Sequence, residues 1–136
     1  MWGPCRAMEI GLAARGLDPA ERVAARRVIE ATVAVSFDLP VAEIAAPTRR
    51  QAPVAFARQV AMYVAHVGLG LSLTDTGALF ERDRTTAAHA CRVVEDRRDD
   101  GDLDRLLDAI EEVVVSWKLT LDWCRQCGKP VGETAA

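Results

Sequence analysis

The sequence lacks a long apolar run. No stretch of its 136 residues approaches the roughly 18 consecutive apolar residues that a membrane-spanning helix needs. Its N-terminus, where Arg6, Glu9 and Arg15 stand among glycines and alanines, also lacks the apolar core of a secretory signal. Half of the residues are hydrophobic and 27% are charged, which is typical of a globular protein. We therefore expect one cytoplasmic domain with a single core, no membrane partner and no multidomain enzyme.

Patterns of catalysis and cofactor binding are missing as well. No G-x-x-x-x-G-K-[ST] phosphate loop occurs, so we expect neither a bound nucleotide nor ATPase activity. No Ser-His-Asp or Cys-His grouping has a catalytic spacing, and we expect the acidic run after Glu95 to face solvent at a helix start. The sequence therefore predicts a non-enzymatic protein without a cofactor.

Cysteine is scarce, and its four copies do not complete a metal site. Cys91 lies on an apolar helical face, where a small core residue is expected. Cys124 and Cys127 form a single C-x-x-C, the pattern of one zinc knuckle or of a redox pair. A structural zinc needs four ligands, and no second such pair exists in the chain. We predict no metal; Cys124 and Cys127 are weak candidates that would need a dimer sharing both pairs.

Lysine is also scarce, and charge is unevenly distributed. Fifteen of the 17 cations are arginine, which suits forked contacts to phosphate and guanine but is equally explained by a GC-rich genome. The net charge of -3 conceals two opposite windows. Residues 49–92 contain six arginines and three acids, whereas residues 95–112 contain nine acids and three arginines. A basic middle therefore precedes an acidic neighbour.

Period-two alternation is nearly absent, so the sequence predicts an all-α fold. Residues 1–18 are expected to be a flexible segment, 19–123 the helical domain, and 124–136 a tail that carries the C-x-x-C. Prolines bracket a basic loop at residues 46–53. Apolar spacing and capping residues predict six helices: 19–37 after the N-cap Asp18, 41–45, 53 to about 68, 72–80, 84–98, and an extended C-terminal helix from about 102 through 121.

The fourth and fifth of these helices, at about residues 72–98, form a helix-turn-helix. Opposite its apolar stripe, the second helix presents Thr85, His89 and Arg92 at i, i+4 and i+7. Arg84 and Thr86 stand at its N-terminal end. Hydroxyl, imidazole and guanidinium groups in this position suit phosphates and base edges of a major groove. We expect Asp83 to cap this helix, because its charge would repel phosphate.

Three stretches resemble one family. They are Ala57–Tyr63 (A-R-Q-V-A-M-Y), Leu71–Thr74 (L-S-L-T) and Arg82–Cys91, which is close to the signature R-D-H-T-T-V-x-H-A. From about Ile29 to Trp117, the sequence resembles the C-terminal DNA-binding domain (domain IV) of the bacterial replication initiator DnaA. The resemblance implies the compact, Trp-repressor-like helical fold of that domain and binding of double-stranded DNA at DnaA-box-like sites.

The resemblance also implies roles for individual residues. An arginine of the loop before the R-Q helix enters the minor groove in the family; Arg49 and Arg50 are the candidates, and Arg50 is better spaced from Gln59. The family's R-Q pair, which contacts the major-groove face and the backbone, corresponds to Arg58 and Gln59. Its signature residues correspond to Asp83, Thr85, Thr86 and His89. Arg84 replaces the usual histidine, and one glycine of the usual turn is missing between Phe80 and Arg82, which puts the base preference at one or two positions in doubt.

The function hypothesis is sequence-specific DNA binding by a regulator of transcription or of replication initiation, located at the nucleoid. The alternative is a protein-interaction module that uses the C-terminal tryptophan and cysteine segment. The apolar stripe from Leu103 to Leu121 is expected to be core, with Trp117 and Trp123 at its distal end as a partner or homodimer contact. His66 is expected to satisfy carbonyls at a helix end and to have no function.

Overall fold

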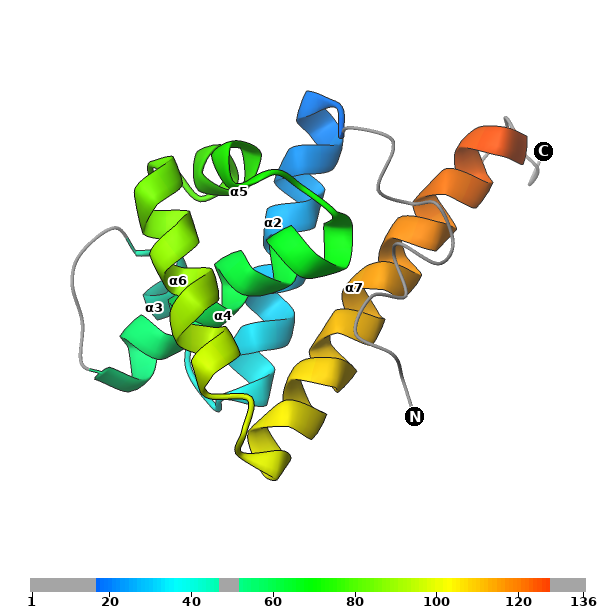
Figure 1. The fold of residues 1–136 in the computed structure, drawn as a ribbon. Coiled ribbons are helices and arrows are strands. Elements are labelled where there is room, and N and C mark those ends of the chain that lie inside the picture. Colours follow the sequence, from blue (N-terminus) through cyan, green and yellow to red (C-terminus); the bar gives the residue numbers. More distant parts are fainter. Residues whose placement is uncertain (1–16, 47–51, 128–136) are drawn as a thin grey trace.

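The computed structural model describes residues 17–46 and 52–127, and these form helices and no strand. The predicted all-α fold with a helix-turn-helix is confirmed. Figure 1 shows a cluster of shorter helices, with one long helix alongside it. In chain order the helices are α2 (Pro19–Ser36), α3 (Val41–Ala45), α4 (Ala52–Leu69), α5 (Leu73–Leu79), α6 (Arg84–Asp96) and α7 (Gly101–Cys127).

Capping residues fix where the helices begin. The Asp18 side chain accepts a hydrogen bond from the Glu21 backbone N–H at 2.9 Å, and the Glu21 side chain accepts one from the Asp18 N–H at 2.9 Å. This reciprocal capping box satisfies two donors at the start of α2. The Ser72 hydroxyl caps α5 by accepting from the Asp75 N–H at 3.0 Å. The Asp18 cap was expected from the sequence, and Ser72 is the first residue of the helix predicted at residues 72–80.

The core surrounds α4, which contacts α2, α6 and α7. Buried side chains from these four helices form one cluster, which includes Ile29, Val60, Val64, Val94 and Val114. Leu17 belongs to the same cluster although the sequence assigned it to a flexible N-terminal segment. Its apolar side chain packs in the core directly before the first cap, so the packed domain includes Leu17.

The helix α7 continues to Cys127, so Cys124 and Cys127 lie on the helix and not in a tail after residue 123. Arg125 near its end forms an ion pair with Glu21 and lies 3.5 Å from the Asp18 carboxylate. These contacts join the end of α7 to the start of α2. In the part of the chain that the structure describes, no helix is both long and apolar enough to cross a membrane.

The expectation that the whole acidic run faces solvent is wrong for Glu111, whose side chain is only 13% exposed. Asp104, Asp108 and Glu111 all form ion pairs with Arg98; the Nε to Asp104 distance is 2.6 Å and the Nη1 to Glu111 distance is 3.0 Å. Arg98 also donates to the Tyr63 hydroxyl at 2.8 Å. Burial raises the pKa of Glu111 to about 7, and this effect outweighs the opposing attraction of Arg98. Arg98 lies between α6 and α7, and the packing of α7 against α4 brings it together with Tyr63 and Glu111.

Candidate nucleic-acid interface

The turn between α5 and α6 packs directly on α5 at Gly77. The Arg82 N–H donates to the Gly77 carbonyl at 2.7 Å. A Cβ atom at Gly77 would lie 2.7 Å from the Arg82 carbonyl oxygen and 2.8 Å from that of Asp83, so a larger residue cannot fit without moving the turn. Glu81 in the same turn has a φ of 58°, a left-handed conformation that glycine adopts more easily. Sequence reasoning missed Gly77, although a glycine inside a short helix before a turn is a usable signal.

Asp83 caps the recognition helix α6, as the sequence predicted. Its carboxylate accepts a hydrogen bond from the Thr86 backbone N–H at 2.7 Å. This bond, followed by one from the Thr86 side chain, lowers the pKa of Asp83. The carboxylate therefore stays charged and holds the first turn of α6, where the predicted DNA-reading residues begin.

The two faces of α6 differ sharply. Ala87 and Ala90 are buried and pack against Met62 of α4, and Val94 is buried in the main core. Because alanine is small, α6 lies close to α4. The five residues that the sequence assigned to the reading face are all exposed: Arg84, Thr85, Thr86, His89 and Arg92. Thr85, His89 and Arg92, which form a ridge along α6, point away from the buried face of the helix, as predicted.

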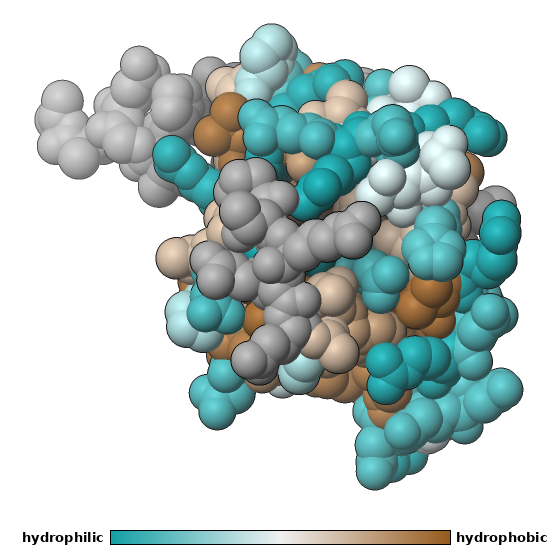
Figure 2. Space-filling model, turned by 90° about the vertical axis from the view of Figure 1, so that its left-hand side faces the viewer, coloured by the Kyte–Doolittle hydropathy of each residue, from teal (hydrophilic) through white to brown (hydrophobic). Residues whose placement is uncertain are grey.

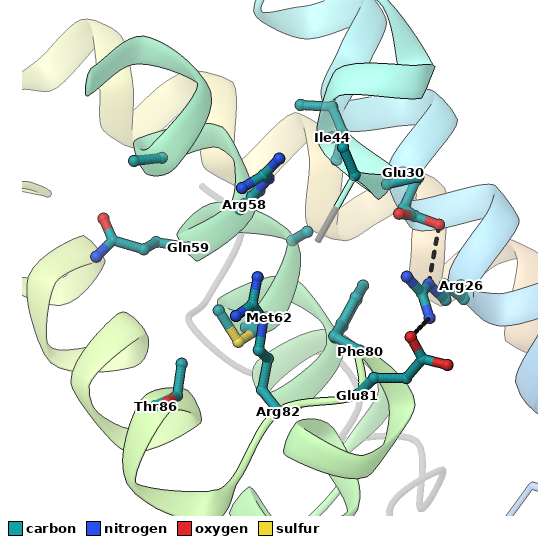
Figure 3. Close-up of a pocket in the computed structure, with 14 residues that line it drawn as sticks. Arg26, Glu30, Ile44, Arg58, Gln59, Met62, Phe80, Glu81, Arg82 and Thr86 are labelled. Carbon is teal, nitrogen blue, oxygen red and sulfur yellow. Dashed lines mark hydrogen bonds and ion pairs between the residues drawn. The ribbon is translucent and has the colours of Figure 1, made fainter. Parts of the chain in front are cut away.

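The R-Q pair lies beside this helix-turn-helix, on α4. Arg58 donates from Nε and Nη2 to the Glu43 carbonyl oxygen, at 3.2 and 2.7 Å. These bonds hold the guanidinium at the end of α3, a contact that the sequence did not predict. Gln59 is half-buried and, together with Thr86, lines a cavity in front of α4 (Figure 3). Arg49 and Arg50, the candidates for minor-groove contact, lie outside the described residues.

Figure 2 looks at the side of the molecule on which α6 and α3 lie in Figure 1. It shows hydrophilic side chains bordering a smaller, more apolar area. Arg84 and Arg92 are exposed on α6, and Arg82 is exposed in the turn before it. Cations on and before a helix with an exposed polar face suit an anionic duplex better than an apolar partner.

The family model described as bacterial dnaA protein helix-turn-helix matches residues 27–94. The chain belongs to this family. The match takes in α3 to α5, the turn and most of α6, and it stops before α7 begins. The DnaA helix-turn-helix is a DNA-binding domain and has no catalytic role, so double-stranded DNA is the partner class of this family.

Curated relatives carry the same name. The chain is 39% identical over 88 residues to the chromosomal replication initiator protein DnaA of Bordetella pertussis, an alignment that covers 63% of this chain and 19% of that protein. It is 34% identical over 77 residues to DnaA 1 of Protochlamydia amoebophila, covering 57% of this chain and 17% of the relative. The chain thus spans less than a fifth of the length of these relatives.

Cys91, His66, Cys124 and Cys127 were also singled out in the sequence, and the structure describes the surroundings of each of them. Cys91 is half-buried against the core, and burial raises the pKa of its thiol to about 11. His66 donates from Nδ1 to the Leu71 carbonyl oxygen at 2.6 Å, in the loop that follows α4. Within residues 17–46 and 52–127, no group of three or more metal-ligating side chains gathers around Cys124 and Cys127.

The two C-terminal tryptophans have different environments. Trp117 is half-buried and packs against the core, and its assignment to a partner contact stays a prediction. Trp123 is 60% exposed on α7. One helical turn earlier on the same side, Leu119 is also exposed. An interaction surface on this helix would therefore use Trp123 and Leu119.

Proposed function

We propose that this domain binds double-stranded DNA sequence-specifically at DnaA-box-like sites, with α6 in the major groove. The observation that carries the proposal is the exposed ridge of Thr85, His89 and Arg92, one to two turns apart on a helix whose opposite face is buried. A helix held in this way can present its N-terminal residues to base edges while its partner helix crosses the backbone.

Each side chain has a role in this proposal. Thr86 and His89 contact base edges or adjacent phosphates, and Arg84 reads a base where the family usually has histidine. Two residues of α4, Arg58 and Gln59, contact the DNA backbone. Arg58 is held for this contact by its two hydrogen bonds to the Glu43 carbonyl. Arg50, or its neighbour Arg49, reaches the adjacent minor groove, in keeping with the family resemblance.

The proposed biological role is regulatory and located at the nucleoid. A domain that occupies DnaA-box-like sites can compete with the initiator or control promoters that carry such sites. These 136 residues contain no phosphate-loop motif, so the proposed regulation works through site occupancy and not through ATP hydrolysis by this domain.

Fluorescence anisotropy with a labelled duplex tests the proposal. We expect tighter binding to a duplex that carries a DnaA box than to one with the box scrambled. We also expect affinity to fall steeply with salt, because roughly one counterion is released for each phosphate neutralised. Equal affinity for both duplexes, or an affinity independent of salt, would reject sequence-specific DNA binding.

A second candidate function is protein interaction through α7, including formation of a homodimer. The exposure of Leu119 and Trp123, which are one helical turn apart, favours it. Sedimentation analysis should then show a concentration-dependent dimer that Trp123→Ala abolishes. If the protein is still a monomer at the highest concentration tested, the homodimer hypothesis is rejected. The DNA-binding proposal does not depend on this result.

A further inference from the structure

A cavity of about 430 Å³ lies between α2, α3, α4 and the turn that joins α5 to α6 (Figure 3). Ile44, Met62 and Phe80 contribute apolar surface to it, from three different elements. Arg58 and Arg82 contribute guanidinium groups to its lining. Its volume falls within the range of about 300–1,000 Å³ found for small-molecule sites, which also combine apolar walls with a few polar groups.

Glu30 supplies an acceptor in the wall of this cavity. The residue is only 6% exposed, and its Oε1 accepts a hydrogen bond from Arg26 Nε at 3.1 Å. Its Oε2 is buried without a hydrogen-bond partner. Figure 3 shows the carboxylate at the edge of the cavity, with only one of its oxygens joined to Arg26. Buried carboxylate oxygens rarely stay unpaired, so a ligand with an N–H donor would complete the site.

We propose that the cavity binds a small planar aromatic anion that carries an N–H donor. The ring lies against Met62 and Phe80, because a thioether and an aromatic ring both make favourable contacts with an aromatic ligand. The N–H group donates to Glu30 Oε2. The anionic group lies near Arg58 and Arg82, since their positive charges attract carboxylate, sulfonate and phosphate groups.

Binding of this ligand opposes DNA binding, a consequence that rests on the proposed function. Gln59 and Thr86 line the cavity and are also proposed to contact DNA. The ligand's anionic group and the DNA backbone both need Arg58. For strict competition, a ligand at ten times its dissociation constant raises the apparent dissociation constant of DNA about elevenfold.

Ligand binding is tested first without DNA, using 8-anilinonaphthalene-1-sulfonate as the probe. This molecule has a planar naphthalene ring, is anionic and carries an N–H group. The chain has three methionines, so ¹³C-methyl labelling gives a simple spectrum in which Met62→Leu assigns the Met62 signal. We expect a saturable shift of the Met62 methyl signal caused by the probe's aromatic ring. Absence of that shift, or probe fluorescence without it, overturns the proposal.

Matched variants locate the site. Glu30→Gln should weaken probe binding about tenfold, whereas Glu111→Gln, which alters a carboxylate in the Arg98 cluster, should leave it unchanged. Ala45→Trp, at an exposed position in the cavity lining, should block the site without disturbing the core. Equal effects of Glu30→Gln and Glu111→Gln, or undiminished binding to Ala45→Trp, overturn the proposal.

The effect of the probe on DNA binding is measured last. The affinity for DNA is first determined without probe and then again with it. If DNA affinity falls as the probe saturates the shift of the Met62 methyl signal, the result supports competition. Unchanged DNA affinity at saturation overturns the proposed competition. If the protein shows no DNA affinity at all, the proposed function fails while the probe titration still decides the binding site.

Discussion

Replacement of Gly77 by alanine tests how tightly the helix-turn-helix is built. The added Cβ would lie 2.7 and 2.8 Å from two backbone carbonyl oxygens of the turn, about 0.6–0.7 Å closer than the 3.4 Å at which ordinary contact begins. These are backbone atoms, held by the Arg82 N–H to Gly77 carbonyl bond, so they cannot move away as a flexible side chain would. Overpacking of this kind costs about 1–3 kcal/mol.

Gly68→Ala is the matched control, because Gly68 is also helical and buried. Its Cβ would meet Val114 at 3.6 Å, an ordinary contact distance. Both substitutions gain the helix propensity of alanine, about 0.5–1 kcal/mol. Gly77→Ala should therefore be less stable than Gly68→Ala by about 1–3 kcal/mol in urea unfolding followed by circular dichroism.

The same pair of variants separates stability from recognition. A displaced turn moves the Asp83 cap and, with it, the first turn of α6, so folded Gly77→Ala should bind a box-containing duplex more weakly than Gly68→Ala does. Equal stability of the two variants would refute the reasoning about the turn. Equal affinity for DNA would show that the turn does not position the reading residues.

Three further predictions concern single side chains. Glu81→Gly should stabilise the domain by up to about 1 kcal/mol in urea unfolding, because φ of 58° is strained for glutamate; a loss of stability would contradict this. Since the pKa of Glu111 is about 7 when folded and 4.5 ordinarily, its contribution to stability falls as pH rises from 4.5 to 7. Glu111→Gln should remove that slope in unfolding measured at pH 5 and 8, and an unchanged slope would assign it to another group. Arg92→Ala should reduce the salt slope of DNA binding by about 1, whereas Arg105→Ala on α7 should not; equal slopes would exclude a phosphate contact by Arg92.

Local sequence signals were sufficient to predict the helices and their starts. Asp18, Ser72 and Asp83 cap helices through hydrogen bonds that span three residues, so each cap is encoded within its own segment. The outward ridge on α6 follows from helical periodicity for the same reason. Its contacts with DNA stay a prediction, as do those of Arg49 and Arg50.

Features that depend on tertiary packing were not predictable from local pattern. Tyr63, Arg98 and Glu111 meet only because three segments of the chain pack together, so the acidic run looked solvated in the sequence. The requirement for glycine at Gly77 depends on where the following turn lies. Likewise, the hydrogen bonds from Arg58 to the Glu43 carbonyl depend on how α3 packs against α4. The composition of the loop between these helices does not predict that packing.

The most direct test of the central claim compares wild type with His89→Ala on a DnaA-box duplex and on single-base-pair variants of that box. If the exposed face of α6 reads DNA, the wild type discriminates among these duplexes, and His89→Ala loses about 1–3 kcal/mol of discrimination at one base-pair position while remaining folded. Unchanged affinity and unchanged discrimination in His89→Ala would contradict the claim that this ridge recognises DNA.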